Sequence, residues 1–154
     1  MQFKHIALAA AAIVIISGSA KAQSLTGKWT AEYPAAIRNT NGQQSAEMGT
    51  ALVTIEQKGD SITGTWHAQN TPRPSQPRRI VGTFKDGQLS FVGEPVEARI
   101  RRGGEEGEQV VMMRSFFEAK LEGDSLVGTM HSKSEDGTIS SQSLKWSAKR
   151  AAEN

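Results

Sequence analysis

From Gln23 onward the chain alternates short runs rich in Val, Ile, Thr, Phe and Trp with tight turns of the types Gly-Asp, Asp-Gly and Gly-Gly. Apolar residues at every second position, bounded by such turns, are typical of β-strands joined as hairpins. Almost no segment has the period of an amphipathic helix. The pattern predicts an all-β fold. Strands are expected at residues 27–33, 51–58, 61–69, 79–85, 88–93, 108–122, 125–133 and 139–150, with a weaker candidate at 96–101.

An internal repeat supports this interpretation. Residues 59–67, Gly-Asp-Ser-Ile-Thr-Gly-Thr-Trp-His, match residues 123–131, Gly-Asp-Ser-Leu-Val-Gly-Thr-Met-His, and residues 80–84 contain a shorter copy. Because hairpins of one design follow one another, we expect a single up-and-down antiparallel barrel of about eight strands, which removes its unpaired edges by closing on itself. The alternative is a two-sheet sandwich of Greek-key topology, which needs longer crossing connections than most of those in this chain.

The N-terminal residues 1–22 have the features of a secretory signal peptide. Lys4 supplies a positive start, residues 6–16 form an apolar run, and Ala20-Lys21-Ala22 is a small-x-small cleavage site. The apolar run is too short to cross a bilayer core, which takes about 20 residues. We therefore expect cleavage after Ala22, export to the periplasm or the extracellular space, and no stable membrane anchor.

The length that remains suits one barrel. Removal of residues 1–22 leaves 132 residues, and eight strands of roughly ten residues with short turns take about 110–130. We expect a barrel domain at residues 23–150 and a disordered tail at residues 151–154. The chain has no cysteine, which excludes a disulfide framework, a thiolate zinc site and a cysteine nucleophile.

Charge argues against a nucleic-acid partner. The chain has 18 basic and 16 acidic residues, and the removed segment carries Lys4 and Lys21 but no acid, which leaves 16 basic residues against 16 acidic. A nucleic-acid-binding domain needs a clear basic excess on one face. The arginine clusters at residues 73–79 and 99–102 are offset by glutamates at residues 94–108.

The first and last strands of the expected barrel carry a recognisable pair of residues. Gly27-Lys28-Trp29 opens the first strand, and Arg150 closes the last. A Gly-x-Trp with a basic residue of the last strand packed on its indole resembles the barrel-closing arrangement of the calycin superfamily, which includes lipocalins, fatty-acid-binding proteins and avidins. Residues 25–29, followed by the hairpin at 59–66, are most similar to avidin-like openings and to small secreted bacterial lipocalin-like proteins.

The resemblance implies a closed barrel sealed at one end by Trp29 and Arg150, and it does not specify a ligand. Biotin binding is not implied, because the later tryptophan-bearing strands of avidins have no clear counterparts here. A cation stacked on an indole contributes about 0.5–2 kcal/mol, whatever the family. The alternative is a buried Trp29 with Arg150 as an unrelated surface residue.

A cavity is the first candidate site. Three glycines, Gly64, Gly82 and Gly128, share the parity of the expected inward residues. Such glycines either mark close approach of the strands or leave unfilled volume, and an eight-stranded barrel is just wide enough to hold one small ligand. The functional interpretation is an apolar cavity lined by Trp66, Phe84, Phe91, Met113, Phe117 and Met130. The alternative is that the glycines only let the strands coil and the aromatic residues fill the core.

Metal binding and catalysis have weaker support. His67 and His131 occupy equal positions in the repeat, but each follows an inward residue and should point outward. Two ligands also fall short of the three or four typical of zinc. Ser61 and Ser125 belong to the Gly-Asp-Ser turns, and no acid or oxyanion loop accompanies them. We therefore expect no metal, cofactor or catalytic residue.

Two surface features suggest a partner. Met112 and Phe116 lie on the outward parity of the long strand at 108–122, where they would form an exposed apolar patch for a partner protein or a second copy of the chain. The loop at residues 70–78 contains three prolines and is therefore semi-rigid, as a lid or a recognition loop would be. The alternative is that it only connects two strands.

The sequence thus predicts an exported, non-catalytic binding protein that holds a small apolar or amphipathic ligand inside its barrel. The alternative is a protein-binding or inhibitor module that acts through the loop at 70–78 and the exposed strand face. An isomerase or cyclase ranks last, because no buried acid–base pair is visible.

Overall fold

The computed structural model describes residues 23–70, 75–100 and 107–152, and all regular structure in them is β-strand. The nine strands are β1 (Gly27–Thr40), β2 (Gln43–Lys58), β3 (Ser61–Gln69), β4 (Arg78–Lys85), β5 (Gln88–Gly93), β6 (Val96–Ile100), β7 (Gln109–Glu122), β8 (Ser125–Ser134) and β9 (Leu144–Arg150). No helix in these residues is long and apolar enough to span a membrane. The predicted signal peptide, Pro72 and Pro74 of the proline-rich loop, and the last two residues of the tail lie outside the described residues.

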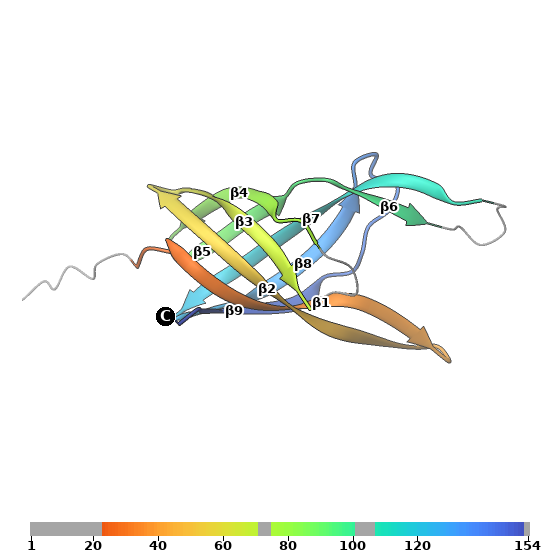
Figure 1. Cartoon of the computed structure of the whole chain (residues 1–154), viewed down its shortest axis with the longest axis horizontal. Coiled ribbons are helices and arrows are strands. Elements are labelled where there is room, and N and C mark those ends of the chain that lie inside the picture. The colour runs from red at the N-terminus through yellow and green to blue at the C-terminus, as the bar shows by residue number, and fades with distance from the viewer. Residues whose placement is uncertain (1–22, 71–74, 101–106, 153–154) are drawn as a thin grey trace, which may run out of the picture.

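Eight of the strands form a closed barrel in which each strand pairs antiparallel with its neighbours (Figure 1). The order is β5-β4-β3-β2-β1-β9-β8-β7, and β5 pairs with β7 to complete the ring. The first and last strands pair with Trp29 opposite Arg150. The predicted up-and-down barrel is confirmed, and the sandwich alternative does not hold.

The hairpin turns explain why neighbouring strands pair. Asn41 and Gly42 have φ of 54° and 79°, and Asp86 and Gly87 have φ of 52° and 77°. Positive φ at both central residues is what a type I′ turn requires, and its twist matches that of the strands. The Gly-Asp turns of the repeat have positive φ only at glycine, 60° at Gly59 and 61° at Gly123.

The first hairpin is longer than predicted. The sequence prediction ended the first strand at residue 33 and left residues 34–50 unassigned, which is wrong, because β1 and β2 continue to a turn at Asn41-Gly42. The register shifts between Pro34 and Ala36, so a bulge accommodates the proline. Pairing of β1 with β9 ends at Glu32 and pairing of β2 with β3 ends at Thr50. Residues 33–49 therefore form a two-stranded ribbon beyond the ring, the β1–β2 arm.

A second ribbon involves the weaker candidate strand. β6 pairs with Gln109–Met113 of β7, beyond the part of β7 that pairs with β5. These residues form the β6–β7 arm, and both arms project from the same end of the barrel (Figure 1).

The predicted start of the last strand at residue 139 is also wrong, because β9 begins at Leu144. The backbone of the β8–β9 loop binds side chains instead: Ile139 N donates to Ser134 Oγ at the end of β8 (2.9 Å), and Thr138 N donates to Asp136 Oδ1 within the loop (3.0 Å). Hydrogen bonds of this kind compete with strand pairing.

The inward glycines bring neighbouring backbones together and leave no volume. A Cβ at Gly64, Gly82 or Gly128 would lie 1.9, 1.9 or 1.8 Å from a backbone oxygen of the adjacent strand. The interpretation that they open a cavity is therefore wrong, and the alternative, in which they let the strands coil, describes them. Beside Gly128, the Trp146 indole donates to the carbonyls of Glu118 and Thr129, both at 3.1 Å.

Candidate ligand pocket

The barrel opens into a pocket of about 520 Å³ at the end that carries the arms. Inward positions near the mouth line it, together with two residues of the β3–β4 loop. The lining residues are Tyr33, Ala35, Trp66, Ala68, Ser75, Gln76, Arg78, Ile80, Gly93, Glu94, Ser115, Phe117 and Met130. This volume is within the range of about 300–1,000 Å³ that is typical of small-molecule sites.

The floor of the pocket is aromatic. The Trp66 ring lies 4.7 Å from Phe117, and Phe117 stacks on Phe91 at 4.6 Å with an interplanar angle of 10°. Trp146 packs edge-on against Phe91 and Phe117, at 5.7 and 5.4 Å. These four rings fill the middle of the barrel, and offset or edge-on contacts of this kind are favourable between aromatic rings. The space above them is the pocket.

The rim of the pocket is polar. The Tyr33 ring packs edge-on against Trp66 at 5.1 Å, and burial raises the pKa of its phenol, an effect that the nearby Arg78 charge partly offsets. Tyr33 therefore keeps its proton at neutral pH and can donate a hydrogen bond. On β7 and β8, the hydroxyls of Ser115, which lines the pocket, and Ser132 lie 3.0 Å apart.

Local sequence explains how Tyr33 reaches the rim. A Cβ at Gly49 would lie 2.8 Å from the Ala35 side chain and 3.4 Å from the Tyr33 ring. Glycine at this position makes room for both the bulge and the ring. The root of the β1–β2 arm thus places the tyrosine over the aromatic floor.

The predicted lining residues lie at different depths. Trp66, Phe117 and Met130 line the pocket. Phe91 lies one layer deeper, under Phe117. Phe84 is buried near the other end of the barrel, where it pairs with Leu89 beside the turn at Asp86.

Met113 is half-buried on the β6–β7 arm, opposite Val96, and is not among the lining residues. Tyr33 and Arg78 were missed, although each continues the inward parity of its strand by one two-residue step from Ala31 or Ile80.

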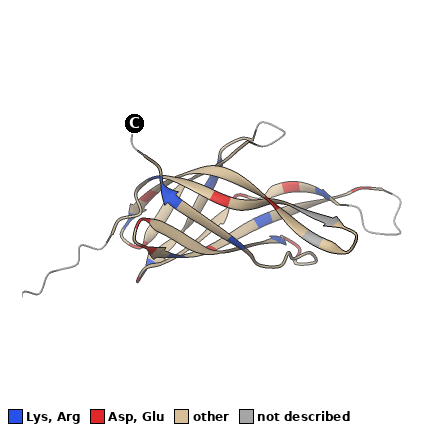
Figure 2. Cartoon of the chain, turned by 90° about the horizontal axis from the view of Figure 1, so that it is seen from below, with Lys and Arg blue, Asp and Glu red and all other residues tan. Residues whose placement is uncertain are grey.

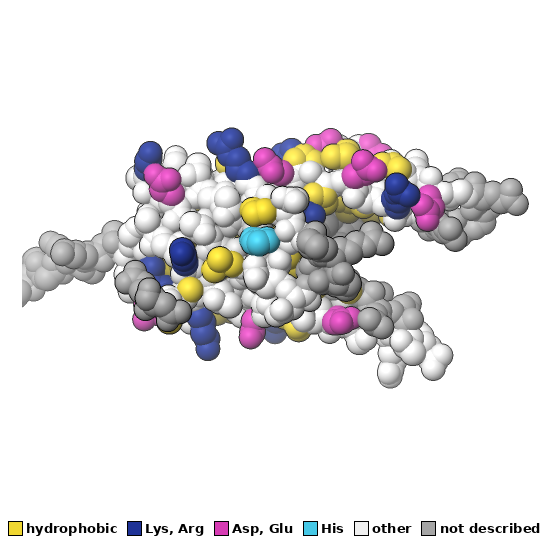
Figure 3. All heavy atoms as spheres, viewed as in Figure 1, with side chains coloured by type: hydrophobic (Ala, Val, Ile, Leu, Met, Phe, Trp, Pro, Cys, Tyr) yellow, Lys and Arg dark blue, Asp and Glu magenta, His cyan; other side chains and the backbone are white. Residues whose placement is uncertain are grey.

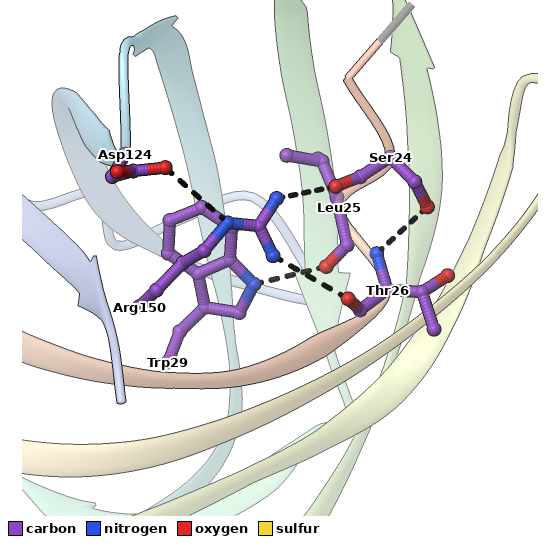
Figure 4. A network of polar contacts seen from close by, with 6 residues as sticks. All are labelled: Ser24, Leu25, Thr26, Trp29, Asp124 and Arg150. Carbon is purple, nitrogen blue, oxygen red and sulfur yellow. Dashed lines mark hydrogen bonds and ion pairs between the residues drawn. The ribbon is translucent and has the colours of Figure 1, made fainter. Parts of the chain in front are cut away.

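The opposite end of the barrel is sealed (Figure 4). Trp29 is fully buried, and its indole donates to Leu25 O at 2.9 Å. The Arg150 guanidinium lies 4.5 Å over the Trp29 ring and donates to the carbonyls of Ser24 and Thr26. Arg150 also forms a 3.8 Å ion pair with the exposed Asp124. These bonds hold residues 24–26 at the barrel end, and we call this segment the N-terminal cap. The side chain of Leu25, within the cap, is fully buried.

The histidines serve other contacts. His67 Nε2 lies 3.0 Å from Ser75 O and ties the β3–β4 loop to β3, while His131 stacks on Phe116 at 5.1 Å. In the described ranges, no group of three or more histidines and acids could hold a metal ion. Ser61 and Ser125 lie beside the tight turns at the start of β3 and β8.

An apolar row crosses the outer face of the barrel. Val81, Val92, Phe116 and His131 are successive cross-strand partners on β4, β5, β7 and β8. Val81 is 42% exposed, and Met112, farther along β7, is 40% exposed. In Figure 3 hydrophobic side chains also gather along the upper right lobe, which is the β6–β7 arm. Figure 2 shows acidic and basic residues interspersed among the strands.

Comparisons with protein-family models, curated proteins and solved structures give no match. The closed eight-stranded antiparallel barrel is compatible with a calycin-like fold.

Proposed function

We propose that this chain is an exported, non-catalytic binding protein that holds a small apolar or amphipathic molecule at the mouth of its barrel. The observation that carries the proposal is the 520 Å³ pocket over the Trp66 and Phe117 rings. Covering this aromatic floor with the apolar part of a ligand is favourable, because burial of apolar surface stabilises a complex by about 25 cal/mol per Å².

Binding without chemistry follows from where the ionisable groups lie. Among the described lining residues, those that titrate are Tyr33, Arg78 and Glu94, and all three are at the rim. In the part of the chain that the structure describes, no carboxylate or histidine lines the floor beside Trp66 and Phe117, where the apolar part of a ligand would rest. A general acid or base must reach the reacting atom by a hydrogen bond, so we assign the pocket a holding role.

The resemblance to lipocalin-like and avidin-like proteins adds to this proposal. In such barrels the closed end seals the interior and the open end admits the ligand. Export through the segment at residues 1–22 would place the protein where small molecules are captured from the surroundings.

A blocked pocket tests the proposed function. Ala68 lines the pocket and is half-buried, so Ala68→Phe should fill part of the space without disturbing the core. Binding of the neutral fluorescent probe N-phenyl-1-naphthylamine should weaken by about tenfold or more, as expected for the loss of roughly 1.4 kcal/mol. Native mass spectrometry of the purified protein should show a bound small molecule that the variant lacks.

Thr65→Phe is the matched control, because Thr65 is exposed on the outer face of the same strand. It should leave probe binding unchanged. Equal binding by both variants, or no probe binding by the unaltered protein, would contradict the proposal.

A second candidate function is favoured by the outer apolar row. Docking of a partner protein, or of a second copy through Met112 and Phe116, would cover Val81, Val92 and Met112. The Pro-rich loop at residues 70–78 belongs to the same alternative. Sedimentation velocity of the unaltered protein and of Phe116→Ser distinguishes these cases: a dimer that the substitution dissociates supports self-association, and a monomer at all concentrations contradicts it.

A further inference from the structure

Among the described residues that line the pocket, Arg78 is the one arginine, and it lies at the rim. Arg78 is the cross-strand partner of Trp66 and shares the inward parity of Ile80 on β4. It lines the pocket directly. Its neighbour Arg79 has the opposite parity and lines a separate depression on the outside of the barrel, with Thr54 and Thr63. Two adjacent arginines thus face different surroundings.

Arg78 differs from three other arginines of the described chain in its partners. Arg99, Arg114 and Arg150 each form an ion pair with a carboxylate, at 3.7, 3.5 and 3.8 Å. Within the described part of the chain, Arg78 forms none. A guanidinium carries several N–H donors in a planar fork that matches carboxylate, sulfonate and phosphate groups. Arg78 is exposed at the rim of the pocket, whose floor is formed by Trp66 and Phe117.

The neighbouring groups also donate. Tyr33 is protonated at neutral pH, as a phenol with an ordinary pKa of about 10 is, so it presents an O–H donor close to Arg78. One hydroxyl of the Ser115–Ser132 pair is a donor to the other, which leaves one O–H free.

Glu94 is the one carboxylate among the described lining residues, and it already accepts a hydrogen bond from Arg79 N at 3.2 Å. Its own backbone N donates to Arg79 O at 3.0 Å. These two bonds hold Glu94 against the β4 backbone at the edge of the mouth.

We propose that the pocket takes an amphipathic anion, whose charged head group pairs with Arg78 at the rim while its apolar part lies on Trp66 and Phe117. This inference rests on the proposed function and names the ligand class. A carboxylate, sulfonate or phosphate head group would all provide the oxygen acceptors that the fork requires.

The test uses two probes that differ by a single charged group. The probe 8-anilino-1-naphthalenesulfonate carries a sulfonate, and N-phenyl-1-naphthylamine is the same ring system without it. The unaltered protein should bind the sulfonate more tightly, by about tenfold, which is the scale of one charge-assisted hydrogen bond. Arg78→Gln should abolish this preference, so that the variant binds the two probes with equal affinity.

Arg79→Gln is the matched control, one residue away and on the outer face, and should retain the preference. Displacement of the sulfonate by dodecanoate, dodecyl sulfate or dodecyl phosphate then separates the three head groups.

The possible failures are distinguishable. Equal affinity for the two probes, or a sulfonate preference that survives Arg78→Gln, overturns the anion assignment and leaves the pocket intact. Tighter binding of a cationic amphiphile such as dodecyltrimethylammonium also overturns it, because Glu94 would then be the dominant charge. Failure of both probes to bind overturns the proposed function together with the inference.

Discussion

Gly128 shows at the scale of one residue what the barrel demands of its sequence. A Cβ at this position would lie 1.8 Å from Glu118 O and 2.6 Å from the Ala119 Cα, and both obstacles are backbone atoms that cannot rotate away. Gly128→Ala should therefore lower the free energy of unfolding by about 3 kcal/mol, the upper part of the range for overpacking. Urea denaturation followed by tryptophan fluorescence measures the change.

Gly93→Ala is the control for this prediction. No heavy atom lies within 4 Å of a Cβ built at Gly93, and neither glycine has positive φ. The change in stability should stay within about 0.5 kcal/mol. Equal losses in the two variants would show that close strand approach is not what Gly128 provides.

Tyr33 permits a direct titration, because it is the only tyrosine in the sequence. Burial raises the phenol pKa and the Arg78 charge lowers it, with burial the larger effect. The absorbance titration of the folded protein should have its midpoint above the ordinary value of about 10. Arg78→Gln should raise the pKa further, whereas Arg79→Gln should leave it unchanged.

The same shift has a consequence for stability. The unfolded chain loses the Tyr33 proton at a lower pH than the folded chain does. Between the two pKa values the folded state binds more protons, so the free energy of unfolding falls as pH rises above about 10. A folded-state midpoint at or below that measured in urea would contradict the burial of Tyr33.

At the scale of an element, the N-terminal cap depends on Trp29. The ring is fully buried, carries Arg150 on its face and binds Leu25 O through its indole nitrogen. Trp29→Ala should lower the free energy of unfolding by about 3–5 kcal/mol. Trp29→Phe keeps much of the buried area but loses the bond to Leu25, so its loss should be smaller. Thermal and urea melts measure both, and a near-neutral Trp29→Ala would count against the sealing role.

The sequence predicted the elements whose turns and parity are local properties. The repeat at 59–67 and 123–131 led directly to two hairpins, and the parity of β7 and β8 followed from counting by two. Residues 34–50 were left unassigned, although Asn41-Gly42 is a strong hairpin signal. Pro34 is unfavourable inside a strand. The proline is tolerated because a bulge follows it.

The sequence predicted only some of the residues that line the pocket. Parity identifies which residues face inward, and it gave Trp66, Phe117 and Met130. It does not say at which depth side chains stop filling the barrel, because this depends on packing between strands far apart in the sequence. Phe91 and Phe84 share the inward parity but lie in the filled part, below the pocket.

At the scale of the whole molecule, the proposed export gives a further prediction. Expressed in a bacterium with residues 1–22 present, the protein should leave the cytosol, and its mature chain should begin at Gln23, as N-terminal sequencing and intact mass would show. Ala22→Tyr places a bulky residue at the cleavage site and should slow processing, whereas Ala9→Val in the apolar run should not. Cytosolic protein that retains Met1 would contradict the assignment.

The place of β9 in the ring has a consequence for how the molecule is made. The final strand of the barrel lies between β1 and β8, so both of these strands keep an unpaired row of backbone N–H and C=O groups until residues 144–150 have been synthesised. Without β9 the sheet is open and has two unpaired edge strands. Such edges can pair with other chains, so this form is prone to aggregation. Pairing of β9 with β1 and β8, rather than the formation of any single hairpin, is therefore the step that removes these unpaired edges.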